Sequence, residues 1–201
     1  MKKLIFLLSL LTVLLLSCGS TKVISADASL SGSSLNPVYI TDKKSITLLP
    51  TRAVEKNIDA VQHFKAHFGQ KDFESDCLLI ADSEKLTVTI LNNFGTTMGE
   101  LNYNNNLVVF NSDLFPKSIK AEYIVADIQF CLYRAADIKK TLEEAGLTFV
   151  FSQEENPDGT SMESRSIFDG DQEIVRIEKS SGLILLSNFL RGYSYTLQGS
   201  F

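Results

Sequence analysis

The feature that most constrains the fold is one helical stripe between two stretches of alternating residues. Between about residues 60 and 110, apolar and polar residues alternate with a period of two, as at Leu86, Val88 and Ile90 with threonines between them. From Ile124 to Ala145 the apolar residues instead recur at spacings of four and three, which is the period of one helix face. The alternation then returns. This order predicts an α+β fold in which an antiparallel sheet packs against helix.

Turn residues divide the two alternating stretches into strands. Pro116 and Ser118 are expected to open the helix, and Gly146 to end it. A break near Tyr133 and Arg134 stays open, because the apolar stripe runs through them. The expected strands are about residues 46–49, 64–68, 77–81, 86–90, 98–103, 107–110, 147–152, 164–168, 173–178, 183–187 and 193–198.

The amino-terminus predicts export and an anchor. Two lysines precede an apolar run from Leu4 to Leu16, which fits a signal peptide over residues 1–17 and is short for a membrane span. The run ends in Leu15-Leu16-Ser17-Cys18-Gly19, which resembles a bacterial lipobox. The resemblance implies a diacylglycerol thioether on Cys18 and a further acyl chain on its freed amine. Glycine after the cysteine then implies the outer membrane, with the chain on its periplasmic face.

Composition and charge characterise the chain beyond the anchor. Residues 18–45 are rich in serine and threonine and predict a flexible tether, which leaves residues 46–201 as one domain. The formal net charge is −5, and loss of Lys2 and Lys3 with the signal peptide would make it −7. A chain with that charge and no basic run is a poor binder of nucleic acid.

The sequence carries no recognisable catalytic or metal-binding constellation. It lacks the glycine-rich phosphate loops, the nucleophile elbow and the paired-cysteine motif. His63 and His67 would lie about 6 Å apart on a helix and could share a metal there, but on a strand they lie about 13 Å apart. The alternation around them favours a strand. We therefore expect no enzyme, no metal and no cofactor besides the acyl groups on Cys18.

Two features leave alternatives open. Cys77 and Cys131 lie in apolar stretches, so they are either buried free thiols or a disulfide formed in an oxidising compartment. Phe94 and Gly95 lie in a polar Asn-Asn-Phe-Gly loop. Phe94 is either a plug that folds back on the core or an exposed side chain that touches a membrane or a lipidated cargo.

Several short segments resemble a known family. Residues 88–97, running into Glu100-Leu101, are similar to the strand–loop–strand of LolB, an outer-membrane lipoprotein that receives other lipoproteins from a periplasmic carrier. Residues 124–129 and 188–193 are similar to an uncharacterised group of LolB-like lipoproteins, some encoded beside aryl polyene lipid biosynthesis genes. The tryptophans usual in LolB are missing, because this chain has none.

The resemblance implies an open antiparallel half-barrel, as in LolB and LolA, with helices covering its concave face. Its apolar cavity would bind an acyl chain, a lipid or an acylated protein, and Phe94 would help to insert the cargo into the outer membrane. A periplasmic carrier protein is then a partner. The alternative is a non-catalytic scaffold of an envelope biosynthetic complex, with a solid core. The candidate lining residues of the cavity are Leu86, Val88, Ile90, Ile124 and Ile128.

Overall fold

Ten strands form one antiparallel sheet, and each of the two alternating stretches supplies five of them. The structure is a computed structural model, and it describes residues 35–112, 120–155 and 159–201. The strands of the sheet are β3 (Ile58–Phe68), β4 (Lys71–Ala81), β5 (Leu86–Leu91), β6 (Thr97–Tyr103), β7 (Val108–Ser112), β8 (Thr148–Glu155), β9 (Ser161–Asp169), β10 (Gln172–Ser180), β11 (Leu183–Asn188) and β12 (Tyr193–Gly199).

The two five-strand meanders are joined by the pairing of β3, the first strand of one meander, with β12, the last strand of the other. The strand order is β7-β6-β5-β4-β3-β12-β11-β10-β9-β8, so β3 pairs with β12 across more than a hundred residues of chain. In this pairing Tyr193 lies opposite Phe68, and Gln198 lies opposite His63. The edges are β7 and β8, which do not pair with each other. The sheet is therefore open, and the predicted α+β class with an unclosed antiparallel sheet is confirmed.

Within the described residues, two helices lie between the meanders, so of the two alternatives the break near Tyr133 is the one found. Helix α2 spans Ala121–Leu132 and helix α3 spans Ala135–Glu144, with Tyr133 extended between them. Tyr133 also bridges to Val54, which explains why the backbone leaves the helix there. Gly146 has a φ of +77°, the left-handed geometry expected of a residue just after a helix. The predicted start at Pro116 and Ser118 lies outside the described residues.

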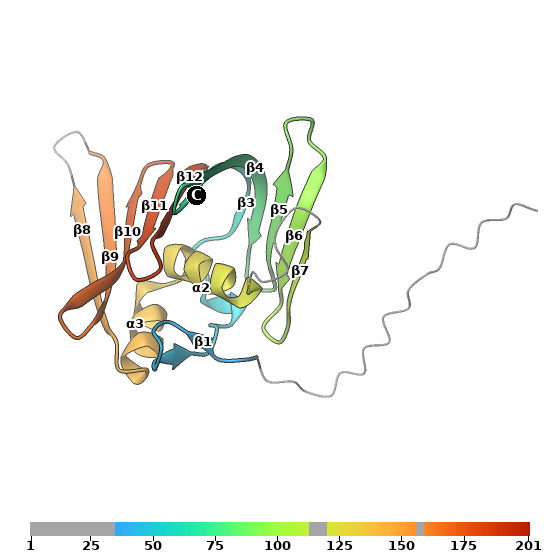
Figure 1. Cartoon of the computed structure of the whole chain (residues 1–201). Coiled ribbons are helices and arrows are strands. Elements are labelled where there is room, and N and C mark those ends of the chain that lie inside the picture. Colours follow the sequence, from blue (N-terminus) through green and yellow to red (C-terminus); the bar gives the residue numbers. More distant parts are fainter. Residues whose placement is uncertain (1–34, 113–119, 156–158) are drawn as a thin grey trace, which may run out of the picture. The chain divides into compact units, whose positions relative to one another are not determined.

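The sheet curves around α2. This helix contacts β7 at one edge and also β10 and β11 in the other meander. Seven strand spacings separate β7 from β10 in the sheet, which is about 34 Å if the sheet is flat. Twelve helical residues span only about 18 Å. A flat sheet could not reach α2 from both sides, and in Figure 1 the two meanders stand on either side of the helix.

The folded part begins earlier than predicted. Residues 35–45 were expected to belong to the tether, but Val38–Tyr39 forms strand β1 and pairs with β2 (Ser45–Ile46). Val38 and Ile40 are 1% and 4% exposed, so they belong to the core. The prediction was wrong here because two-residue strands in a polar segment give almost no period to detect. Residues 18–34 and the signal peptide lie outside the described residues.

Polar side chains fix α2 against the segment that comes after β2. Gln129 is 1% exposed, and its amide accepts a hydrogen bond from the Leu49 N–H at 2.9 Å and donates one to the Leu49 carbonyl at 2.8 Å. The hydroxyl of Tyr103, on β6, donates to the same carbonyl at 2.8 Å. These bonds satisfy backbone groups that would otherwise be buried unpaired. They set which face of α2 meets the sheet.

Candidate functional site

The inner face of the sheet is the candidate site, and strand β5 shows how it opens toward solvent. Val88 lies opposite Leu79 and Leu101, which are 1% and 2% exposed, and paired residues point to the same face. Leu86 is completely buried on this face, whereas Val88 and Ile90 are only partly buried. Burial therefore falls along β5 toward its turn.

That turn carries Phe94, which is 92% exposed. The Asn92 carboxamide oxygen accepts hydrogen bonds from the N–H groups of Phe94 and Thr96, both at 2.9 Å. Gly95 has a φ of +76°, which a side chain would disfavour, and its N–H donates to the Asn92 carbonyl at 2.8 Å. The turn is thus fixed by its own polar groups. The structure excludes the alternative in which Phe94 plugs the core.

A row of aromatic rings continues the inner face across β3, β4 and β12. Neighbouring ring centroids lie 5.6 to 6.4 Å apart, a spacing at which rings attract each other. Tyr195, in the middle of the row, is 9% exposed, whereas Phe68, at one end, is 48% exposed. The row therefore leads from the core to solvent, as β5 does. Its members are Phe64, Phe68, Phe73, Tyr193 and Tyr195.

A buried carboxyl group lies where α2 meets this row. Asp127 is 7% exposed, and the Tyr193 hydroxyl donates a hydrogen bond to its Oδ2 at 2.5 Å. The Asn188 amide donates to the same hydroxyl at 3.1 Å. Burial raises the pKa of Asp127 to about 7, although the Tyr193 hydrogen bond and the nearby charge of Arg191 oppose the shift. A titratable group thus couples α2 to β11 and β12.

These residues come from the two segments that carry the second resemblance. Residues 124–129 lie on α2, and residues 188–193 form the end of β11, the next turn and the start of β12. Asp127 and Tyr193 are 66 positions apart in the sequence, and the fold brings them into contact. Neither had been predicted to act in a site, because periodicity shows which face a residue lies on and not which distant residue it meets.

The five predicted cavity residues lie at different depths. Leu86 is fully buried and Ile128 is 6% exposed, so both belong to the core. Val88 and Ile124 are partly buried and pack against that core, and Ile90 is also partly buried. Apolar surface is therefore accessible beside three of them. That the five line a cavity stays a prediction.

Arg165 is a buried cation that was not predicted from the sequence. It is completely buried on β9, and its guanidinium donates to the carbonyls of Phe130 and Tyr133 at 3.0 and 2.6 Å, at the end of α2. It also forms salt bridges with Glu163 at 2.6 Å and with Glu55 at 2.9 Å. The position was detectable, because Arg165 lies two residues from Ile167 and therefore on the same face of the strand.

Of the helix and strand alternatives for the two histidines, the structure shows the strand. His63 and His67 lie on strand β3, as the alternation predicted, and hydrogen-bond to carboxylates of β4. The hydrogen bond to Asp76 is the main cause that raises the pKa of His63. Across the described ranges, no cluster of three or more metal-ligating side chains occurs.

Cys77 and Cys131 are free thiols, and the disulfide alternative is not formed. Both side chains are buried, and burial raises the pKa of each to about 12. The thiols are therefore protonated and unreactive near neutral pH. Cys18 lies outside the described residues.

The fold and the inner face define an α+β protein with one open antiparallel sheet, curved around a helix that carries a buried carboxyl group. Within the described residues, no helix has both the length and the apolar character that a membrane crossing requires. Residues 59–199 match a family described as a protein of unknown function, DUF3261, and the chain belongs to this family. None of the curated proteins matches the chain.

Proposed function

We propose that the protein is an outer-membrane lipoprotein that binds an acyl chain, a lipid or an acylated protein on the inner face of its sheet and helps to transfer it to the outer membrane. Transfer of this kind rests on differential binding, and no bond is made or broken. The chain would therefore not be an enzyme. A periplasmic carrier protein would deliver the cargo.

Phe94 is the observation that carries the proposal. An apolar ring that is 92% exposed has no role in packing, and its turn is held by four hydrogen bonds that keep the ring in solvent. Exposed apolar groups on ordered elements are typical of surfaces that meet a membrane or a partner. The partly buried apolar side chains of β5 lead from this turn toward the core, which supports passage of an acyl chain between them.

Cargo binding can be tested by native mass spectrometry of the protein purified from cell envelopes. We expect an adduct of acyl-lipid mass that is lost on denaturation. Ile90→Asn, on the inner face of β5, should lower the adduct fraction about fivefold or more, because an acyl chain would then contact a polar amide. Thr89→Asn, on the outer face of the same strand, is the matched control and should keep the adduct. Equal adduct fractions in both variants would argue against the inner face as the site.

A second candidate function is a non-catalytic scaffold of an envelope complex. The complete burial of Leu86 and the near-complete burial of Ile128 favour it, because these residues belong to the core. A clean apo mass, with no uptake of added fatty acid or acyl peptide, would support the scaffold.

Phe94→Glu should impair transfer without affecting stability. The ring is almost fully exposed, so the free energy of unfolding should change by less than about 0.5 kcal/mol. Loss of an apolar contact and gain of a charge should slow transfer of a fluorescent acyl lipid to acceptor vesicles by about tenfold or more. Leu107→Glu is the control, since Leu107 is 51% exposed beside another turn. A large drop in melting temperature, or equal transfer rates for the two variants, would contradict the role of Phe94.

Lipidation is tested by Cys18→Ala. The variant lacks the thiol that would carry the diacylglycerol, so we expect a precursor that no longer fractionates with the outer membrane. Fractionation identical to that of the unaltered chain would refute the anchor.

A further inference from the structure

A cationic and aromatic surface lies beside the first described strand. We call it the Arg191 patch, and its residues come from β1, the start of α2 and the turn between β11 and β12. The three large apolar side chains of the patch are 43% to 50% exposed. The members of the patch are Tyr39, Lys120, Tyr123, Phe189, Leu190 and Arg191.

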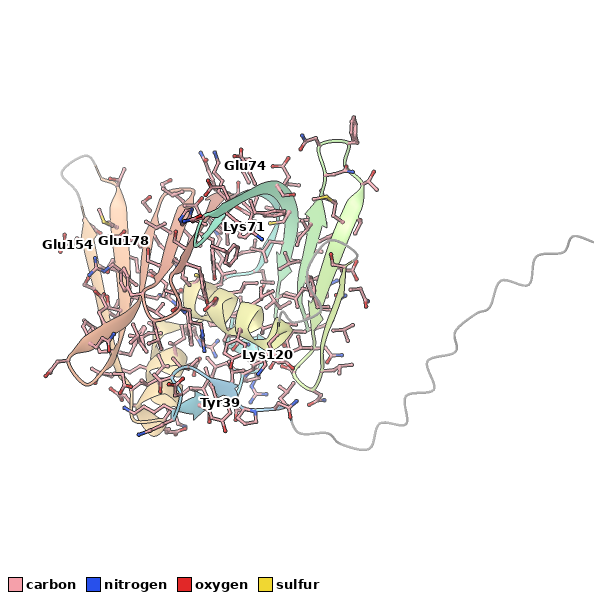
Figure 2. All side chains as sticks on the ribbon, in the orientation of Figure 1. Tyr39, Lys71, Glu74, Lys120, Glu154 and Glu178 are labelled. Atoms are coloured by element: carbon pink, nitrogen blue, oxygen red, sulfur yellow. The ribbon has the colours of Figure 1, made fainter. Side chains whose placement is uncertain are left out.

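The two cations of the patch converge on one ring. The guanidinium of Arg191 lies 4.3 Å from the ring centroid of Tyr123, and the ammonium of Lys120 lies 5.8 Å from it. Arg191 also donates a hydrogen bond to the carbonyl of Tyr39. Within the described residues, neither cation forms a salt bridge. Figure 2 labels Lys120 and Tyr39, and both lie in its lower part, near β1.

The turn that carries the apolar side chains is held in place. The N–H of Phe189 donates to the Ile174 carbonyl at 2.9 Å, and the N–H of Arg191 donates to the Asn188 side chain at 2.9 Å. Gly192 comes next, with a φ of +67°. Phe189 and Leu190 are nevertheless 50% and 43% exposed, so an ordered turn keeps two adjacent apolar groups in water. Such an arrangement indicates a surface that is covered when the protein acts.

The chemistry of the patch matches the headgroup region of a membrane. Arginine and lysine bind phosphates, tyrosine rings partition to the interface, and phenylalanine and leucine enter the acyl boundary. The formal net charge of the chain is −5, yet the patch brings two positive charges, Lys120 and Arg191, to one tyrosine ring. An anionic phospholipid surface complements both the charge and the apolar groups.

The position of the patch agrees with this partner. Tyr39 belongs to the first described strand, and the described part of the chain begins at Leu35, four residues before it. Residues 19–34 can span at most about 55 Å. We propose that the Arg191 patch docks on anionic phospholipid headgroups of the membrane in which Cys18 is anchored. This inference rests on the anchor in the proposed function.

Docking at the patch also determines whether the Phe94 turn faces the membrane or points away from it. In Figure 1 the turn between β5 and β6 and strand β1 lie at opposite ends of the sheet. With β1 and the patch on the membrane, the Phe94 turn would face away from it. Phe94 would then contact an incoming carrier or cargo, and not the membrane that holds the anchor.

The test places a fluorophore on the patch of the full lipidated chain in vesicles. Leu190→Cys gives an exposed thiol for an environment-sensitive label, whereas Cys77 and Cys131 are buried and do not compete. We expect lipids with nitroxide headgroups to quench the label in phosphatidylcholine vesicles that contain phosphatidylglycerol. Quenching should fall in high salt and in phosphatidylcholine alone. Lys120→Gln should lower the docked-to-undocked ratio about fivefold, because one cation is lost.

Glu74→Cys is the control label position. Glu74 is exposed on β4, and in Figure 2 it lies far from Tyr39, so its label should not be quenched. Tyr39→Cys provides a second label position on the patch if Leu190→Cys does not fold. Equal quenching at positions 190 and 74, or quenching that does not depend on the presence of phosphatidylglycerol, would overturn the proposal. A change at position 190 only on addition of another envelope protein would also overturn it, in favour of a protein partner.

Failure of docking and failure of cargo binding are distinguishable. Loss of quenching with an intact acyl adduct overturns the docking surface alone. An absent adduct with normal quenching overturns the carrier function and leaves the docking surface. Cys18→Ala separates the anchor from both.

Discussion

Replacing Arg165 with methionine should lower the free energy of unfolding by about 3–5 kcal/mol. The guanidinium is completely buried, and it pairs with Glu163 and Glu55 while donating to two carbonyls at the end of α2. Methionine fills a similar volume but supplies no donor. The carbonyls then lose their partners, and Glu163, only 15% exposed, keeps a single cation, Lys179 at 3.0 Å. Chemical denaturation monitored by circular dichroism measures the loss.

Arg176→Met is the matched control on the neighbouring strand. Arg176 also forms a salt bridge, with Glu173, but its side chain is 47% exposed. Exposed pairs contribute about 0–1 kcal/mol, so this variant should stay within about 1 kcal/mol of the unaltered protein. Equal losses for the two variants would mean that Arg165 contributes no more than a surface ion pair, and that the end of α2 is held by other contacts.

Strand β5 was predictable because one of its faces lies against the core. Leu86, Val88 and Ile90 alternate with threonines, and the structure places them on the inner face of β5 as the alternation indicated. The same reasoning failed at Val38, where the strand has two residues and is too short to repeat a period. Local pattern therefore identified long strands and missed short ones.

The pairing that joins the two meanders was not predictable. Strands β3 and β12 are both ordinary alternating strands, and the sequence of neither indicates which strand it pairs with. Gly199 shows the fit that results: a Cβ built there would lie 2.2 Å from the Gln62 side-chain oxygen on β3. Such complementarity is visible only once the two strands are adjacent.

The candidate site was predictable in part. The exposed turn at Phe94 was one of two alternatives, and the apolar face of β5 was expected. The contact between Asp127 and Tyr193 was not, although the two segments that contain them had been singled out separately. A carboxyl group in an apolar helical stretch was a signal, because a charge in such a place needs a partner.

Asp127 should make the stability of the protein fall as the pH rises from about 4 to about 7. Burial raises its pKa from 3.8 to about 7 in the folded state. The folded chain therefore holds a proton in this interval that the unfolded chain has already lost, and stability decreases with pH. Below pH 4 both states are protonated, and above pH 7 both are ionised, so the effect is confined to the interval. A shift of about three units corresponds to about 4 kcal/mol at most.

Asp127→Asn isolates this effect from other titrations. Asparagine keeps an oxygen that can accept the hydrogen bond from Tyr193 but cannot ionise. We therefore expect the variant to lose most of the pH dependence and to be the more stable of the two proteins at pH 8. His63 also has a raised pKa, so its stabilising contribution is likewise lost as the pH rises, but it is present in both proteins and cancels in the comparison.

Asp59→Asn is the control, since Asp59 is exposed on β3. Denaturation midpoints between pH 4 and pH 8 should differ from the unaltered protein in a pH-dependent way for Asp127→Asn and not for Asp59→Asn. Parallel curves for all three proteins would mean that the Asp127 carboxyl is ionised in the folded state throughout. The contact between α2 and β12 would then contribute nothing to the pH dependence of stability in this interval, and a difference that grew toward acid would mean that the charged form is the one stabilised. The sign of the slope therefore decides how α2 is attached to the inner face that we propose binds cargo.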